Sequence, residues 1–437
     1  MDAAITIAIF ITVFVVIYLE AVDRRVAVIL GAAAIVVCGL LAGFFSLQMA
    51  IESIYFETLT LIFGMSAISA ILTRSGLFTL IATRTANHAM GNGWWVLLMF
   101  VLVTYGLSLM VNNLAAMVVI LPVTLSVCAQ MKINPVPLLI AEIIASNLGG
   151  ASTMVGDFPN MIISSAGNLH FIDFIGGMMV PCLVLLAVLL GYFQYRRKEF
   201  AAGVENGGST GGRMDEPATD PHLMKVGLYV LGLSLVGFLL GDITGLRPGW
   251  VAVIAGIVVL FLAGGEGGGE KDWFAACGGQ DIVFFACLFI MVGGLVAAGA
   301  LDGVVWLIQT ISDGQGVLMM LALMWISAFL TIFLNAGATT AFFVPVASSM
   351  DAAIADPTVW WALSLGVLAG SSAALTGATA GPLAATHLDR FIKAHPGTAD
   401  AIPAGGHLDF KGYLYWGLPV MGIFLVLSSF YVIAVAL

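Results

Sequence analysis

The stretch Ser146-Asn-Leu-Gly-Gly-Ala-Ser-Thr-Met-Val-Gly-Asp-Phe-Pro-Asn160 is a polar, glycine-rich island between long apolar runs. Gly149 and Gly150 weaken a helix, because glycine costs about 1 kcal/mol relative to alanine in a helix interior. Pro159 lacks an N–H donor and clashes with the preceding helical turn. A helix is therefore predicted to break here. At membrane depth such a break is tolerated only where protein or a watery cavity satisfies the freed backbone groups, as in transporter binding sites.

The composition is that of a membrane protein. The 437 residues are 61% hydrophobic and 9% charged, whereas soluble domains carry about 25% charged residues. At least ten segments approach the length of about 20 apolar residues that a bilayer-spanning helix needs. We expect an all-α polytopic membrane protein. The run Ala3–Leu19 is interpreted as a retained first helix, because no basic region precedes it.

The reactive side chains do not form a catalytic or metal-binding pattern. The five cysteines are scattered without a C-x-x-C pair, and the six histidines stand at span ends or in loops without metal-ligand spacing. No nucleophile–base pair stands out. We therefore expect no enzymatic activity, no cofactor and no metal site.

The second half of the chain repeats the first with a constant shift of 223 residues. Chance matches between apolar stretches are common, but matched prolines and asparagines at one fixed spacing are not. The sequence predicts a first repeat over residues 1–198, a polar linker over 199–223 and a second repeat over 224–437. Repeats of this size are typical of secondary transporters. The matched pairs are Arg24 with Arg247, Gly76 with Gly299, Asn112 with Asn335, Pro122 with Pro345, Thr153 with Thr376 and Pro159 with Pro382.

Each repeat is predicted to hold about five transmembrane helices, one of them broken, and one re-entrant helical hairpin. The arms of the first hairpin, Trp94–Val111 and Leu114–Met131, meet at Asn112-Asn113 without a loop. Five crossings are an odd number, so the second repeat should be inverted relative to the first. The remaining elements of the first repeat are predicted as Ala3–Leu19, Val26–Phe44, Thr58–Thr73, the broken helix Pro137–Ser165, and Phe171–Tyr195.

The basic residues predict an orientation. If the N-terminus lies outside, all but one of the 15 lysines and arginines fall on the cytoplasmic side, the exception being Arg247. This agrees with the positive-inside rule. We expect a bacterial inner-membrane protein with both termini in the periplasm and the linker in the cytoplasm.

Two acidic residues are candidates for ion coupling. Asp157 stands where the helix breaks, and ionisable groups inside a bilayer mark ion pathways or proton relays. Alternatively, Asp157 caps the half-helix that follows it. Its counterpart in the second repeat is Ala380, so the two half-sites are not equivalent. Glu142, one turn before Ser146, is either a second titrating group or a paired buried acid.

Polar side chains at the hairpin tips and at the breaks are candidate substrate ligands. An amide offers two donors and an acceptor, which suits a neutral hydroxylated solute or an anion. The alternative role for Asn112, Asn113 and Asn335 is to cap the hairpin turns. Each hydroxyl alone is more often bonded back to its own helix than to a ligand. The candidate hydroxyls are those of Ser152, Thr153, Thr339, Thr340, Thr376 and Thr379.

The stretch from Ser146 to Ile163 resembles the signature of the ion transporter superfamily, and Phe56–Phe78 is also similar to it. The nearest group is the cluster of arsenite permeases, sodium–proton antiporters and P proteins. The resemblance implies two inverted repeats, each with a re-entrant hairpin and a broken helix, and a substrate site between the tips and the breaks. That site would comprise Asn112, Asn113, Gly150–Thr153, Asp157, Asn335–Thr340 and Thr376–Thr379.

Within this cluster, Gly156-Asp-Phe-Pro-Asn160 resembles the Gly-Asp-Pro-Pro-Asn of arsenite permeases and P proteins. The Val-Thr-Thr that usually follows the aspartate in the sodium antiporters is absent. The second break, Ala373–Pro382, also departs from the family, because it lacks the Gly-Gly-Asn that is common there.

The resemblance implies proton-coupled efflux of arsenite and antimonite by alternating access, as in arsenical resistance. Arsenous acid is mostly neutral near pH 7 and gains nothing from the membrane potential, which is worth about 2.3 kcal/mol per charge per 100 mV. Uphill export therefore needs a moving charge, with Asp157 as the candidate proton carrier. The alternatives are a sodium–proton antiporter, a sodium-coupled carboxylate or oxyanion transporter, and a channel. The expected partners are the inorganic substrate, protons and the lipid bilayer, with no nucleic acid and with a soluble ATPase partner left open.

Overall fold

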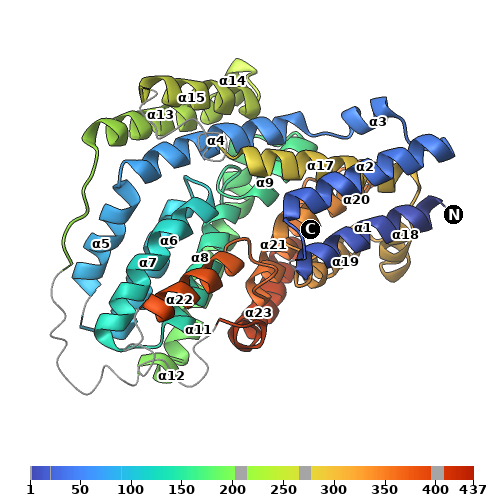
Figure 1. Cartoon of the computed structure of the whole chain (residues 1–437). Helices are drawn as coiled ribbons and strands as arrows, with labels where there is room; N and C mark the ends of the chain where they lie inside the picture. Colours follow the sequence, from blue (N-terminus) through green and yellow to red (C-terminus); the bar gives the residue numbers. More distant parts are fainter. Residues whose placement is uncertain (1, 20, 90, 202–213, 265–276, 395–407) are drawn as a thin grey trace.

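The computed structural model describes residues 2–19, 21–89, 91–201, 214–264, 277–394 and 408–437. Within these ranges the regular structure is helical, without a strand (Figure 1). Seven of the described helices are long and apolar enough to cross a membrane, and seven shorter apolar helices accompany them. The predicted all-α membrane fold is confirmed. Twelve residues of the predicted linker, 202–213, lie outside the described ranges.

The first repeat contains eleven described α-helices and one π-helical turn. They are α1 (Asp2–Tyr18), α2 (Arg24–Ala42), α3 (Leu47–Glu52), α4 (Phe56–Arg74), α5 (Leu77–Ala89), α6 (Gly93–Ser108), α7 (Asn113–Met131), α8 (Pro135–Ala151), α9 (Phe158–Gly167), α10 (Phe171–Phe174), η1 (Ile175–Met179) and α11 (Val180–Tyr195).

The short helix α12 (Lys198–Ala201) follows, and the second repeat then begins. Its described helices are α13 (Pro221–Leu239), α14 (Gly241–Thr244), α15 (Pro248–Leu262), α17 (Gly279–Ala297), α18 (Asp302–Ile311), α19 (Gly316–Thr331), α20 (Ala336–Ile354), α21 (Thr358–Ala373), α22 (Gly381–Ala394) and α23 (Phe410–Ala436).

The helix boundaries reproduce the internal repeat. Helices α17, α19 and α20 begin and end 223 residues after α4, α6 and α7, which is the shift seen in the sequence. The hairpins are α6–α7 and α19–α20, and the broken helices are α8–α9 and α21–α22. In both hairpins an asparagine precedes the second arm, and in both breaks a proline stands in the first turn of the second half-helix. The broken helices and hairpins were therefore predicted at the correct places.

The packing between repeats shows their inversion. Arg24 at the start of α2 forms an ion pair with Asp281 in the first turn of α17, so these packed helices run in the same direction. The ion pair between Arg247, just before α15, and Glu57, in the first turn of α4, shows that α15 and α4 also run in the same direction. Because α2 and α4 are consecutive spans of opposite direction, α17 runs opposite to its counterpart α4. The second repeat is thus inverted.

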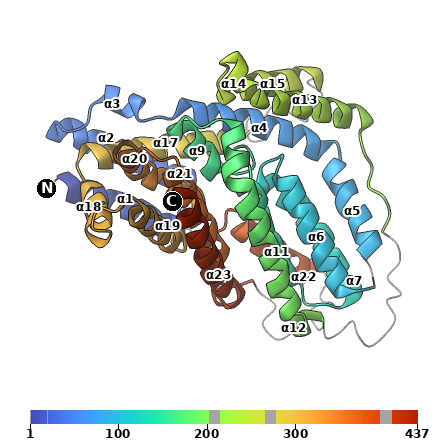
Figure 2. The same cartoon turned by 180° about the vertical axis from the view of Figure 1, so that it is seen from behind.

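The hairpins and the broken helices pack reciprocally at the centre of the molecule. The half-helix α9 packs against α20 of the other repeat, and its counterpart α22 packs against α7. The first half-helices, α8 and α21, pack against one another, while α11 and α23 contact each other on the face that Figure 2 shows in front. This arrangement brings both breaks and both hairpin tips towards one central region.

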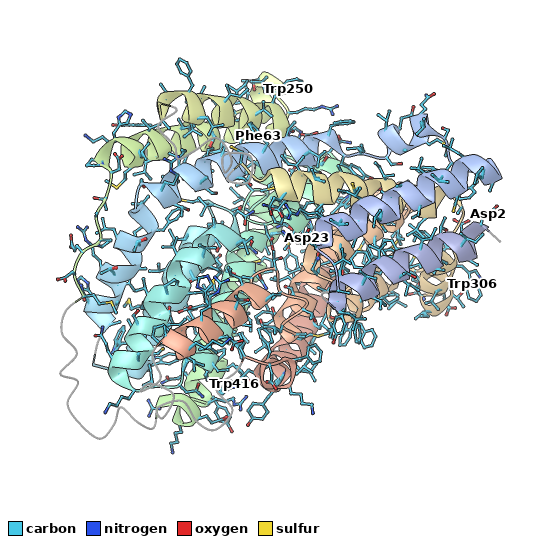
Figure 3. The ribbon with its side chains drawn as sticks, viewed as in Figure 1. Asp2, Asp23, Phe63, Trp250, Trp306 and Trp416 are labelled. Carbon is cyan, nitrogen blue, oxygen red and sulfur yellow. The ribbon has the colours of Figure 1, made fainter. Side chains whose placement is uncertain are left out.

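The pattern of burial separates central helices from outer helices. Helices α8 and α21 are buried on nearly every side, as expected of helices that are apolar all round. Outer helices expose large apolar side chains that a bilayer would cover. Trp250 of α15 and Trp306 of α18 lie on the outer surface (Figure 3). The breaks that follow α8 and α21 therefore lie in the core of the protein.

Two described helices of ten or more residues were not predicted from the sequence. Helices α5 and α18 occupy equivalent places, each between the third span and the hairpin of its repeat. They are short, and α5 carries Arg84 and His88 on an exposed side. They were missed because the prediction relied on long apolar runs, and these helices have only one apolar face.

Candidate functional site

The break between α8 and α9 depends on the close approach of two chain segments. A Cβ atom added at Gly150 would lie 2.7 Å from Cβ of Asp157 and 3.1 Å from the carbonyl oxygen of Gly156. A side chain at position 150 would therefore push Asp157 away from the end of α8. The glycine predicted as a helix breaker also makes room for the carboxyl group.

Asp157 is the N-cap of α9. Its buried carboxylate accepts a 2.8 Å hydrogen bond from the backbone N–H of Phe158, and the side chain of Asn113 also interacts with it. The backbone N–H of Asn113 in turn donates to the carbonyl of Gly156 at 3.1 Å. The capping role considered in the sequence is thus present, and it ties the break to the hairpin tip.

Asn160 was not predicted as a site residue, yet it makes the densest contacts at the break. Its side-chain NH₂ donates to the carbonyls of Ala151 and Thr153 at 2.9 and 3.1 Å. Its side-chain oxygen accepts a 2.8 Å hydrogen bond from the Ser364 hydroxyl of α21, in the other repeat. An asparagine in the apolar run Phe158–Ile163 was the signal that could have revealed it.

Thr153 and Thr376 have the same role in the two repeats. The Thr153 hydroxyl donates to the carbonyl of Leu109 at 2.9 Å, and the Thr376 hydroxyl donates to that of Ile332 at 2.8 Å. Each threonine thereby joins its break to the hairpin of the same repeat. The two hydroxyls were predicted as candidate ligands, and in this structure they are engaged in these internal bonds.

The other tip residues are also tied to the backbone. Asn112 and Asn335 cap α7 and α20, accepting 2.8 Å hydrogen bonds from the N–H groups of Leu114 and Ala338. The remaining hydroxyls differ: those of Ser152 and Thr340 donate to the carbonyl four residues earlier, and that of Thr339 is buried without a hydrogen-bond partner in the described structure.

A cavity of about 500 Å³ opens beside the second repeat's tip and break. Asn335, Thr376 and Thr379 line it, and each of them is partly exposed. The equivalent residues Asn112 and Thr153 of the first repeat are buried. The structure therefore divides the predicted site residues into an accessible set and an enclosed set.

A second, much smaller cavity of about 10 Å³ lies between the two repeats. Asn147, Asp157 and Asn160 line it from the first repeat, and Ser364 and Ser371 line it from the second. Its volume is close to the lower limit for one water molecule. This cavity brings Asp157 next to the other repeat.

Glu142 lies apart from the residues that line these two cavities. The Thr124 hydroxyl of α7 donates a 2.7 Å hydrogen bond to Oε1 of Glu142, and Oε2 is buried without a partner among the described residues. Glu142 is therefore a buried acid hydrogen-bonded on one side between α7 and α8, and its role as a titrating group or as a paired acid stays a prediction.

The buried charges are acidic. Among the described residues, Glu142 and Asp157 are the buried charged side chains, and no lysine or arginine is buried with them. The described residues also contain no group of histidine, cysteine, aspartate or glutamate side chains that could hold a metal ion. The site is thus built from carboxyl, amide and hydroxyl groups together with backbone ends.

A membrane protein built from inverted repeats, with paired broken helices around a buried carboxylate, has the architecture of a secondary transporter. Residues 14–366 match the model of the citrate transporter family, CitMHS. The chain belongs to this family, which is part of the ion transporter superfamily. The predicted superfamily and the transporter class are confirmed.

Known proteins resemble all or part of the chain. The magnetosome protein MamN of Magnetospirillum gryphiswaldense is 47% identical over 435 residues, which cover 99% of each chain. An uncharacterized transporter of Mycobacterium tuberculosis is 31% identical, with 85% of this chain and 88% of that protein covered. The human P protein is 35% identical over 206 residues, which are 45% of this chain and 25% of that protein.

The fold also has a solved relative. The crystal structure of the Alcanivorax borkumensis YdaH transporter matches with a TM-score of 0.60, covering 90% of this chain and 88% of that chain at 14% identity. At this identity the likeness concerns the fold. The family match supports transport and membrane location, whereas arsenite export, the inner membrane and the orientation of the termini stay predictions.

Proposed function

We propose that this protein is a secondary active transporter that works by alternating access, with Asp157 taking up and releasing the proton that drives transport. The observation that carries the proposal is the position of Asp157: a buried carboxyl group at a helix break, next to a hairpin tip and to the opposite repeat. No basic side chain is buried with it in the described structure. A carboxyl group without a permanent countercharge can be neutralised by a proton or by a small cation.

The unequal access of the two half-sites supports alternating access. Asn335 and Thr376 lie beside an open cavity, whereas Asn112 and Thr153, at the equivalent positions, are enclosed. In a protein with inverted repeats, an exchange of these two environments opens the site to the other side of the membrane. The reciprocal packing of α9 with α20 and of α22 with α7 provides two similar interfaces for such an exchange.

Arsenite is the first candidate substrate. Arsenous acid is a small neutral solute with three hydroxyl groups, and the open cavity offers it the amide of Asn335 and the hydroxyls of Thr376 and Thr379. Its hydroxyls can donate to and accept from the amide of Asn335 and the hydroxyl of Thr379, and they can donate to the Thr376 hydroxyl, whose own proton is bonded to Ile332. Its binding requires no buried positive charge, in accord with the acidic character of the site. We propose export in exchange for protons, with antimonite as a second solute of the same chemistry.

Sodium is the second candidate, and a different observation favours it. The small central cavity is bordered by the carboxylate of Asp157, two asparagine side chains and two serine hydroxyls. Oxygen atoms of this kind are the ligands that hard cations prefer. Alternating occupation of Asp157 by Na⁺ and H⁺ would make the protein a sodium–proton antiporter.

Citrate is the third candidate, because it is named in the description of the family. A tricarboxylate carries several negative charges at neutral pH, and transfer of unpaired charge into a protein interior is costly. The described site has no buried lysine or arginine to compensate them. Citrate transport by this protein would therefore require accompanying cations.

Flux measurements in proteoliposomes test the proposal. Arsenite, Na⁺ and citrate are supplied separately, each with and without a pH gradient, to the wild-type protein and to Asp157→Asn. We expect one solute to accumulate against its gradient only when the pH gradient is present, and the variant to lose this accumulation. Equal flux with and without the gradient, or unchanged accumulation in the variant, would contradict the proposal.

A further inference from the structure

The outer part of the open cavity contains an ion pair between the repeats. Nη2 of Arg24, at the start of α2, lies 2.8 Å from Oδ1 of Asp281, in the first turn of α17, and both residues line the cavity. The Arg24 guanidinium also lies 5.5 Å from the ring centre of Phe284. Its side chain is 45% exposed, against 17% for Asp281. Arg24 thus belongs to the exposed part of the cavity lining, whereas Asn335 is half-buried.

The remaining acid of the cavity mouth is also paired. Asp23, at the junction of α1 and α2 (Figure 3), accepts two 2.8 Å hydrogen bonds from the Arg25 guanidinium. Hydrogen bonds from the side chain and from the backbone N–H of Arg25 hold the pKa of Asp23 well below its usual value. Asp23 is thus ionised at working pH and is compensated by Arg25. Asp281 is therefore the acid in direct contact with Arg24, which also interacts electrostatically with Asp23.

The same device occurs at the equivalent place of the other repeat. Arg247, 223 residues after Arg24, stands before α15 and lies 3.7 Å from Glu57 in the first turn of α4. Because the repeats are inverted, this pair belongs to the opposite face of the membrane. Each face of the membrane therefore has an arginine paired with an acid of the opposite repeat. The residues around the two ion pairs differ.

We propose that Arg24 and Asp281 form a charge filter at the mouth of the cavity, in which Asp281 masks the guanidinium so that anionic solutes gain no attraction there. The inference rests on the proposed function, since it concerns solutes that enter the same site. A cleft lined by charge of one sign concentrates oppositely charged solutes by about tenfold or more. A masked arginine abolishes this advantage for anions, while neutral solutes such as arsenous acid pass unaffected.

Paired substitutions test the filter, because they unmask charges of opposite sign. Asp281→Asn leaves Arg24 uncompensated and should strengthen inhibition of transport by citrate by about tenfold at low salt. Arg24→Gln leaves Asp281 uncompensated and should weaken inhibition by citrate. The effect should appear in the inhibition constant and the KM, with the maximal rate little changed, and should diminish in high salt because salt screens exposed charges.

Two further variants separate charge from structure. The exchange of charges in Arg24→Asp with Asp281→Arg restores a masked pair and should return citrate inhibition towards the wild-type value. Glu57→Gln removes the equivalent acid of the other face and should change citrate inhibition only from the opposite side of oriented vesicles. If Asp281→Asn does not fold, Arg24→Gln and the exchanged pair still decide the outcome.

The results distinguish this inference from the proposed function. Gradient-driven flux in the wild-type protein, without opposite changes in citrate inhibition in the two single variants, would overturn the filter and leave the transporter proposal intact. Absence of gradient-driven flux of arsenite, Na⁺ and citrate in the wild-type protein would overturn the transporter proposal and the filter with it.

Discussion

The side-chain amide of Asn147 donates a 3.1 Å hydrogen bond to the hydroxyl of Ser371, across the boundary between the two repeats. A second bond across the same boundary, from Ser364 to Asn160, measures 2.8 Å. Both bonds lie at the wall of the small cavity that Asp157 also lines. The break of the first repeat is therefore positioned by side chains of the second, and any movement of one repeat relative to the other must change these contacts.

Asn160→Ala should destabilise the protein by roughly 2–4 kcal/mol, because it leaves the buried carbonyls of Ala151 and Thr153 and the hydroxyl of Ser364 without their partner. Ser364→Ala removes only one of these bonds and should cost about 1 kcal/mol. Thermal unfolding of the detergent-solubilised variants measures both. The double variant should lose less stability than the sum of the losses in the two single variants, because both substitutions remove the same hydrogen bond. Full additivity would show that the bond contributes nothing to stability.

Asp157→Asn should fold and lose accumulation driven by the pH gradient while keeping downhill exchange of the solute. Asparagine can still accept the hydrogen bond from the Phe158 N–H, so the cap of α9 is preserved. It cannot take up and release a proton. Counterflow and gradient-driven uptake in the same vesicles measure the two activities, and Asp302→Asn, an exposed change in α18, is the control. An Asn variant that still concentrates solute would remove Asp157 from the coupling mechanism.

Glu142→Gln should keep gradient-driven transport. The residue lies between α7 and α8 rather than among the side chains that line the two cavities, and its bond from Thr124 can also be accepted by glutamine. Uptake measured with and without the pH gradient tests this expectation. If the Gln variant transports the solute downhill but no longer against its gradient, Glu142 belongs to the proton path after all.

Gly150→Ala should disrupt the break. The new methyl group would lie 2.7 Å from Cβ of Asp157, and overpacking of this kind typically costs about 1–3 kcal/mol. Gly106→Ala in α6 is the matched control, because a Cβ atom there meets nothing within 4 Å. It should stabilise the protein by up to about 1 kcal/mol, the usual gain from replacing a helical glycine. Equal unfolding temperatures of the two variants would contradict the steric argument.

Asn335→Ser should weaken substrate binding without loss of stability, whereas Asn112→Ser should leave both unchanged. Serine retains the N-cap at either position, but it lacks the amide that Asn335 presents to the open cavity. Asn112 is buried at the equivalent cap. The KM for transport and the unfolding temperature are the measurements. A similar rise in KM for both variants, measured from the side on which the cavity opens, would show that the two tips contribute equally.

Much of the fold could be predicted from the sequence because its causes are local. Gly149, Gly150 and Pro159 interrupt a helix wherever it lies, and apolar length by itself separates a membrane span from a loop. The duplicated prolines and asparagines revealed the repeat. The odd number of membrane crossings in each repeat then predicted that the second repeat is inverted. Asp157 could be selected as a candidate coupling residue for the same reason, because an acidic residue at a predicted helix break can be recognised from the local sequence.

The tertiary structure decided which of these groups meet. Nothing local to Asn160 indicates that Ser364, 204 residues away, completes its hydrogen bonds. Nothing local to Arg24 selects Asp281 from the other acids of the chain. The equivalent asparagines at the two tips also differ in their surroundings: Asn335 borders an open cavity, and Asn112 is enclosed. These facts depend on how the two repeats pack, because hydrogen bonds and ion pairs between distant residues form only after the helices have been brought together.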